Sequence, residues 1–180
     1  MTVRFCDAAE AEARLPELGA LLANAVTDGA SVNFMAGFTP ADGEAFWCGQ
    51  LPGLRAGERR LLVAEEVGQI VGTVVLSFAL QPNGPHRAEI GKMLVDTAHR
   101  RQGLGRQLLC AAENAALQAG RTLLLLDTEA GSAGAALYAA CGWTPYGTLP
   151  GHSYTPAGRL AAAIYFFKAL GPHRKPGNPA

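Results

Sequence analysis

The spacing of apolar residues in the first third of the chain predicts one short strand and two helices. Residues 3–6 alternate between apolar and polar side chains, as in a strand with two different faces. Asp7 and Glu10 stand in capping-box positions, so a helix is expected to begin there and to stop at residues 28–29. Its apolar positions recur every three or four residues, at Leu15, Leu18, Leu21, Leu22 and Val26. A second helix is expected after residues 39–40, Thr-Pro, because proline suits the first helical position.

The middle of the chain predicts three strands. Residues 61–65 and 70–80 are apolar runs separated by a turn at 66–69, a pattern that favours an antiparallel hairpin. Residues 81–85 contain two prolines, which cannot donate to a strand ladder, so they should interrupt the sheet. The next strand is expected at residues 86–95.

A long helix and a buried strand follow. Residues 103–119 keep one face apolar, and Gly120 is a natural stop. The strand expected at residues 122–127 begins with an almost unbroken apolar run, which indicates burial on both faces in a parallel pairing. Strand 86–95, the helix and strand 122–127 therefore form a predicted βαβ crossover.

The last third predicts a short helix and two strands. The helix is expected at residues 133–140, capped by Ser132 and ended by Gly142. Strands are expected at residues 143–149 and 159–168. The fold class is therefore mixed α/β with one central sheet.

Composition narrows the class of protein. Of the 180 residues, 49% are hydrophobic and 17% charged, which argues against disorder. Fifteen basic residues balance fifteen acidic ones, so we expect neither a nucleic acid nor a membrane partner. The chain shows no signal-peptide pattern and no apolar stretch long enough to span a bilayer, and a cytoplasmic location is expected. One domain is expected over residues 1–170, with a flexible Pro/Gly-rich tail at 171–180.

Cysteine and histidine patterns give no indication of a metal. The four cysteines lack the spacing of zinc ligands or redox motifs, and the histidines do not cluster. We expect no metal and read the cysteines as small hydrophobic residues.

The segment between strand 86–95 and the long helix predicts an anion site. It consists of Arg100, Arg101, Gln102, Gly103, Leu104, Gly105 and Arg106. Unpaired N–H groups open a helix, glycine lets an anion reach them, and arginine adds charge, so a pyrophosphate is expected. The segment lacks the Gly-Lys-Ser/Thr ending of a Walker loop and the third glycine of a Rossmann fingerprint.

These residues carry a family resemblance. Arg100-x-x-Gly103-x-Gly105 is similar to the Arg/Gln-x-x-Gly-x-Gly/Ala signature of the GCN5-related N-acetyltransferases (GNAT), and residues 137–143 resemble their Leu-Tyr-x-x-x-Gly-Phe element. Residues 126–132, together with segments between 149 and 166, look closest to the tabtoxin-resistance type of acetyltransferase. The family often has Asn where this chain has Gly131, and Ser132 is a candidate substitute for that coenzyme contact.

The resemblance implies a fold, a co-substrate and a binding site. It implies an acyl-CoA N-acyltransferase fold with a splayed mixed sheet flanked by helices, and acetyl-CoA as co-substrate. The pantetheine would bind backbone groups of Met93 and Val95 on the open strand edge, and the diphosphate would bind residues 100–106. The N–H of Leu94 is a candidate donor to the oxyanion.

Three residues are candidates for proton transfer. Tyr138 is the candidate general acid for the leaving thiolate, the alternative being a ring that packs on the sheet. Glu89 and Asp127 are alternative candidates for the general base. Glu89 would share a face with Gly91, Met93 and Val95 if the strand is regular, whereas a bulge would reverse its face. A solvated strand-start carboxylate (Glu89) and a helix or turn cap (Asp127) remain the other interpretations.

The resulting hypothesis is an N-acetyltransferase that acts on a primary amine by direct attack in a ternary complex. The acceptor would be a small molecule, such as an amino acid derivative, a polyamine or an amino-bearing toxin. A peptide or protein amine is an alternative within the enzyme class, and an acyl-CoA-binding sensor without activity is the alternative outside it. A homodimer is left open.

Overall fold

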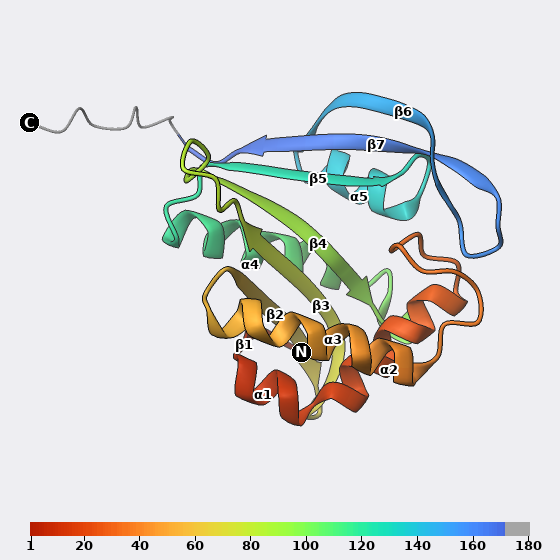
Figure 1. Ribbon diagram of the computed structural model, residues 1–180. Coiled ribbons are helices and arrows are strands. Elements are labelled where there is room, and N and C mark those ends of the chain that lie inside the picture. Colours follow the sequence, from red (N-terminus) through yellow and green to blue (C-terminus); the bar gives the residue numbers. More distant parts are fainter. Residues whose placement is uncertain (172–180) are drawn as a thin grey trace, which may run out of the picture.

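A computed structural model describes residues 1–171 and contains one seven-stranded sheet in the order β1-β2-β3-β4-β5-β7-β6 (Figure 1). The strands are β1 (Thr2–Cys6), β2 (Arg59–Glu66), β3 (Gln69–Phe78), β4 (Arg87–Val95), β5 (Leu123–Glu129), β6 (Thr144–Tyr154) and β7 (Leu160–Ala169). The helices are α1 (Ala8–Ala13), α2 (Leu15–Thr27), α3 (Pro40–Arg55), α4 (Leu104–Gln118) and α5 (Ala133–Ala140), with a short 3-10 turn at Thr97–His99. Only β4 and β5 pair in parallel; the other neighbours are antiparallel.

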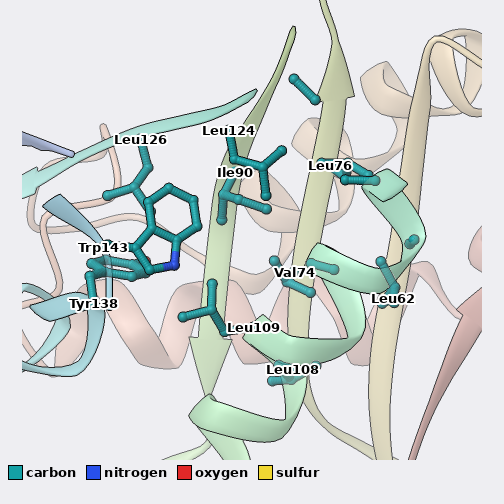
Figure 2. Packing of buried hydrophobic residues seen from close by; sticks show 14 of the residues in the cluster. Leu62, Val74, Leu76, Ile90, Leu108, Leu109, Leu124, Leu126, Tyr138 and Trp143 are labelled. Carbon is teal, nitrogen blue, oxygen red and sulfur yellow. The ribbon is translucent and has the colours of Figure 1, made fainter. Parts of the chain in front are cut away.

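Two apolar cores lie on the two faces of the sheet. The larger core packs α4 and α5 against β2–β5, and Figure 2 shows Leu108 and Leu109 of α4 facing the strand residues Val74 and Ile90. The smaller core packs α1–α3 against the other face, around Trp47. The indole N–H of Trp47 donates to a backbone carbonyl of α2 at 2.9 Å, so its burial leaves no unpaired donor. The helices thereby fix the sheet from both sides.

Most predicted elements are confirmed, and the differences have local causes. The single helix predicted from Asp7 is in fact α1 and α2, interrupted at Arg14, because Pro16 in the first turn of α2 cannot donate to a continuous ladder. Strand β6 continues past the predicted end at residue 149 because an irregular register between Leu149 and Ser153 absorbs Pro150. Beyond Gly171, the predicted tail lies outside the described residues.

The pairing between β4 and β5 is short. Only residues 87–89 of β4 pair with residues 123–125 of β5, although both strands continue beyond these positions. Figure 1 shows the two strands diverging from there. The expected splayed sheet is confirmed, and the diverging part of β4 has one edge with no strand beside it.

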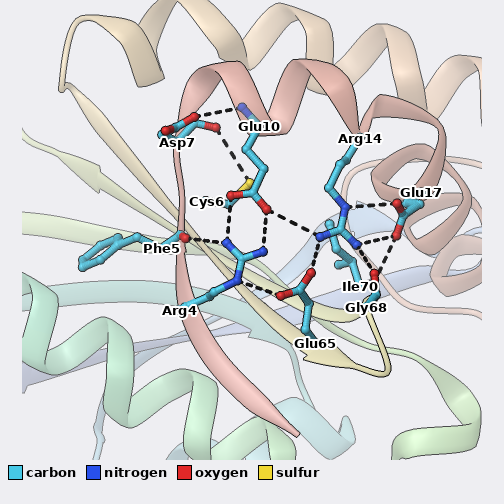
Figure 3. A network of polar contacts seen from close by, with 10 residues as sticks. All are labelled: Arg4, Phe5, Cys6, Asp7, Glu10, Arg14, Glu17, Glu65, Gly68 and Ile70. Carbon is cyan, nitrogen blue, oxygen red and sulfur yellow. Dashed lines mark hydrogen bonds and ion pairs between the residues drawn. The ribbon is translucent and has the colours of Figure 1, made fainter.

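An ion-pair network ties β1 and β2 to the first helices (Figure 3). Arg4 Nε donates to Glu65 Oε2 at 2.7 Å and Arg4 Nη1 donates to Glu10 Oε2 at 2.8 Å. Arg14 also pairs with Glu65 and with Glu17. The hydrogen bonds from Arg4 and then Arg14 lower the pKa of Glu65 to about 2. Because this carboxylate has two guanidinium partners, it links three separate elements.

Glu65→Gln is expected to destabilise the fold by about 1–2 kcal/mol at pH 7, because it removes the charge that both arginines share. The contribution of a carboxylate with a lowered pKa is present above its unfolded pKa of about 4.3 and is lost as the pH falls toward 2. Denaturant unfolding of both proteins should therefore show a difference at pH 7 that shrinks in acid. Glu12→Gln, which breaks an exposed pair with Arg55, is the control. Equal losses in the two variants would contradict the assignment.

Among residues 1–171, no helix has the length and apolar character needed to cross a bilayer.

Candidate active site

A cleft of about 950 Å³ runs from the N-terminus of α4, along the gap between β4 and β5, to the wall formed by α3. Glu89, Asp127 and Tyr138 line it together with most of the segment 100–106. Residues between positions 25 and 138 that are far apart in the sequence are thus brought to one cavity. The structure therefore places the three candidate proton-transfer residues beside the predicted anion loop.

The anion loop has a backbone that leaves donors free. Arg101 and Gly103 have positive φ angles of 63° and 81°. Gly103 is the N-cap of α4 and provides no side-chain cap, and the first backbone bond of the helix runs from Gln107 N to Gly103 O at 3.1 Å. The N–H groups of residues 104–106 precede that bond and have no partner within the helix. They form an anion-binding turn reinforced by the helix dipole.

The three arginines of the loop differ in availability. Arg100 is engaged by the protein, since its Nε donates to the Val95 carbonyl at 3.1 Å and Nη2 contacts Asp28 at 3.2 Å. Arg101 and Arg106 line the cleft and form no ion pair with any residue in 1–171. Arg100 therefore holds the loop on β4. Arg101 and Arg106 provide the positive charge that is available to an anion.

Gln102 and Gly105 make structural contacts that the sequence did not predict. The side chain of Gln102 donates to the Ala98 carbonyl at 3.2 Å and does not line the cleft. A Cβ at Gly105 would lie 3.0 Å from Leu137 Cδ2, so glycine there allows α4 to approach α5 closely. A Cβ at Gly103 would meet no atom within 4 Å, so this position is the one that is open to a bulky ligand.

Strand β4 contains a bulge, which the sequence left open as the alternative to a regular strand. Thr73 pairs with Leu94 and Val75 pairs with Gly91, so Lys92 and Met93 together lie opposite one residue of β3. Lys92 has φ 45°, and its carbonyl accepts from the fully buried Thr73 hydroxyl at 2.9 Å.

The bulge reverses the alternation of side chains along β4, so the faces expected for a regular strand are wrong. Glu89 and Gly91 lie on the side of α1–α3, whereas Met93 and Val95 pack against the core formed with α4. Glu89 therefore does not share a face with Met93 and Val95.

The directions of the backbone N–H groups of β4 also favour a different oxyanion donor from the one predicted. The Asp96 N–H donates to the Val71 carbonyl of β3 at 2.9 Å. Donors alternate along an antiparallel strand, so the N–H of Leu94 also points toward β3 and that of Val95 points toward the gap. The Leu94 hypothesis does not fit this register. Val95 is the better candidate.

Tyr138 combines a core position with access to the cleft. Its ring lies 5.9 Å from Trp143 and 6.0 Å from Phe166, and the side chain is 7% exposed. Within residues 1–171, its hydroxyl has only the Met93 sulfur as a partner, at 3.8 Å. Burial, with a smaller effect of the Asp127 charge, raises the pKa of Tyr138 to about 12. The phenol is therefore a protonated donor at neutral pH.

The two carboxylate candidates face the same gap. Glu89 ends the paired part of β4, and Asp127 lies on β5 two residues beyond Leu125, the partner of Glu89. Partial desolvation by the cleft walls, and then the charge of Asp127, raise the pKa of Glu89, whose side chain remains accessible to solvent. The structure thus brings both candidates together, and each affects the electrostatics of the other.

Lys92 is a cleft residue that the sequence interpretation missed. Its Nζ lies 5.1 Å from the ring centre of Phe46 and 5.5 Å from that of Phe34. Burial lowers the pKa of Lys92, and the Asp127 charge opposes this shift. A lysine directly before the apolar run at residues 93–95 was the available signal.

Comparison with known proteins identifies the family. The model of the acetyltransferase (GNAT) family matches residues 23–143, which is more than half of the chain. The chain belongs to the GNAT acetyltransferase family. It is an acetyl-CoA-dependent acetyltransferase, which confirms the enzyme prediction over that of a binding module without activity.

Solved structures of GNAT acetyltransferases share the whole fold. A ribosomal-protein-alanine N-acetyltransferase from Brucella melitensis is 28% identical, with a TM-score of 0.75 over 94% of this chain and 100% of that one. A Salmonella typhimurium protein assigned as an acetyltransferase, solved with its cofactor acetyl-CoA, is 22% identical, with a TM-score of 0.76 over 98% of both chains. A protein assigned as a phosphinothricin N-acetyltransferase is 20% identical, with a TM-score of 0.76 over 95% of this chain and 99% of that one. The last two likenesses establish the fold alone.

The cleft of this GNAT enzyme fits acetyl-CoA. Free N–H groups and two unpaired arginines lie at one end, and the open edge of β4 runs from there to Glu89. The loop would hold the diphosphate, and backbone groups of β4 would hold the pantetheine. Ser132 lines the same cleft, although its hydroxyl already caps α5 by accepting from Ala135 N at 3.1 Å.

Proposed function

We propose that this enzyme transfers an acetyl group to the primary amine of a small molecule by direct attack in a ternary complex. The observation that carries the proposal is the continuity of one cleft from the free N-terminus of α4 to the polar groups Glu89, Asp127 and Tyr138. We also propose that residues 1–170 act as one catalytic domain.

Each step has a candidate group in the cleft. Acetyl-CoA supplies a thioester, an acyl group activated for transfer. Glu89 or Asp127 accepts the proton that the attacking amine loses. The N–H of Val95, on the open edge of β4, donates to the oxygen that gains negative charge. The Tyr138 phenol donates its proton to the leaving sulfur.

A small acceptor is favoured by the walls of the acceptor end. The ring of Phe46 and the side chain of Gln50, both from α3, line it, and Phe34 packs edge-on against Phe46 at 5.4 Å between ring centres. The motif likeness at residues 126–132 supports the tabtoxin-resistance type and thus an amino-bearing toxin or a similar small amine. The Brucella relative, whose name specifies a ribosomal protein, makes a peptide amine the second candidate.

The direct test is release of free thiol from acetyl-CoA with a panel of amines. The panel should contain amino acid derivatives, polyamines and short peptides that begin with alanine. Turnover of a small amine with kcat/KM well above that of the peptides supports the proposal. Preference for the peptides would overturn the choice of acceptor.

Gly103→Ala is expected to weaken acetyl-CoA binding by about tenfold or more, because a Cβ in the left-handed region distorts the donor turn. Gly120→Ala is the matched control, since Gly120 has φ 72° at the other end of the same helix. Both variants should lose about 1–2 kcal/mol of stability. Calorimetry with acetyl-CoA should separate them. Equal affinities in the two variants would remove the loop assignment.

A further inference from the structure

Arg59 is a half-buried cation in the acceptor end of the cleft that has no carboxylate partner. It opens β2, lines the cleft, and forms no ion pair with any of residues 1–171. Its Nη1 donates to the side-chain amide oxygen of Gln50 on α3, and the other guanidinium donors remain open. Arg4 and Arg14, which are also partly buried, pair with glutamates, whereas Arg60, which has no carboxylate partner among residues 1–171, lies over aromatic rings on the other face. A partly desolvated charge without a counterion is unfavourable, so this position indicates an absent anion.

The register of the sheet places Arg59 relative to the carboxylates. Arg59 pairs with Ser77 on β3, and Ser77 pairs with Glu89 on β4. Directly paired residues project to the same face, and all three line the same cleft. The side chains of Arg59, Ser77 and Glu89 therefore form a row across three strands, with a cation, a hydroxyl and an anion in that order. Two strand spacings, about 10 Å, separate its ends.

The position of Arg59 is fixed by its surroundings. A Cβ at Gly53 of α3 would lie 3.3 Å from Arg59 Cδ, so the aliphatic stem lies against the bare backbone of α3. Its neighbour Arg60 points to the other face, over the rings of Phe5 and Phe78. Only the first of these two consecutive arginines can therefore reach a ligand in the cleft.

We propose that the acceptor is a primary amine that carries a carboxylate or another anionic group several bonds away, with this group bound by Arg59, Gln50 and Ser77. This deepens the proposed function and rests on it. The amine end of the acceptor would lie at Glu89 and Asp127, because these carboxylates attract its positively charged ammonium group. Arg59 then determines specificity and is a binding residue that takes no part in proton transfer.

The test compares ω-amino acids with their neutral carboxamides. The probes are γ-aminobutyrate, δ-aminovalerate and ε-aminocaproate, each beside its amide, with thiol release as the readout. We expect the wild-type enzyme to prefer the acid about tenfold or more in kcat/KM at the best chain length. Arg59→Gln should remove the preference, because it should raise KM of the acid by a much larger factor than KM of the amide. Arg59→Lys should retain part of it.

Arg55→Gln is the control, because it removes the same charge from α3 outside the cleft and should leave the preference intact. Three results would overturn the inference: no preference in the wild-type enzyme, equal losses for acid and amide in Arg59→Gln, or a preference lost in Lys92→Gln but kept in Arg59→Gln. Turnover of amides without a preference for acids leaves the proposed function standing. Absence of turnover with every amine would reject the proposed function and the inference together.

Discussion

Tyr138→Phe is expected to lower kcat by about two orders of magnitude while acetyl-CoA affinity stays unchanged, because the variant keeps the ring and loses the proton donor. The ring contacts with Trp143 and Phe166 do not involve the hydroxyl. Only the Met93 sulfur, at 3.8 Å, loses a partner, so stability should change by less than about 1 kcal/mol. Steady-state kinetics, calorimetry and thermal unfolding together distinguish a chemical role from a packing role.

The pH dependence adds a second criterion for Tyr138. Its pKa of about 12 means that the phenol stays protonated through the usual assay range. The ratio of kcat between wild type and Tyr138→Phe should therefore be constant between about pH 6 and pH 10, because this whole range lies below the pKa of the phenol. Tyr146→Phe, at an exposed tyrosine of β6, is the matched control. If Tyr138→Phe retained full kcat at every pH, the hydroxyl would have no role in the chemistry.

The anion loop could be predicted from sequence because its determinants are local. Two glycines, three arginines, a preceding strand and a following helix all stand within a short stretch, and backbone geometry at Gly103 follows from residue type. The separate duties of the three arginines could not be predicted. Arg100 is held by Asp28, which is distant in sequence, and only the fold brings them together.

The faces of β4 show where sequence periodicity fails. Alternation predicts Glu89 and Met93 on one face, and the bulge at Lys92 places them on opposite faces. The bulge depends on a carbonyl contact with Thr73 of β3, a tertiary interaction that outweighs the usual avoidance of positive φ by lysine. The direction of the Leu94 N–H changes for the same reason, since register decides which donors face the gap.

Arg59 illustrates a different limit. Nothing in the local sequence separates it from Arg60, and both stand at the start of one strand. Their opposite directions follow from strand alternation, but the partner of each follows from the helices on either face. The strand predicted from sequence begins only at residue 61, so neither arginine is a candidate from sequence, and the fold determines which one reaches the cleft.

Glu89→Gln is expected to lower kcat/KM by about two orders of magnitude if Glu89 is the general base, because the amide cannot accept the amine proton. The pKa of Glu89 is raised by burial and then by Asp127, so activity should be present above that raised value and fall as the pH drops through it.

Asp127→Asn separates the two carboxylates. It removes the neighbouring negative charge, which lowers the pKa of Glu89 and should move the acid limb of the kcat/KM profile to lower pH while substantial activity remains. If Asp127 is the base instead, Asp127→Asn will remove the activity and Glu89→Gln will retain it. Profiles of both variants with one acceptor, measured beside Glu12→Gln as a surface control, decide between the two, because the general base is the carboxylate whose neutral variant loses activity across the pH range.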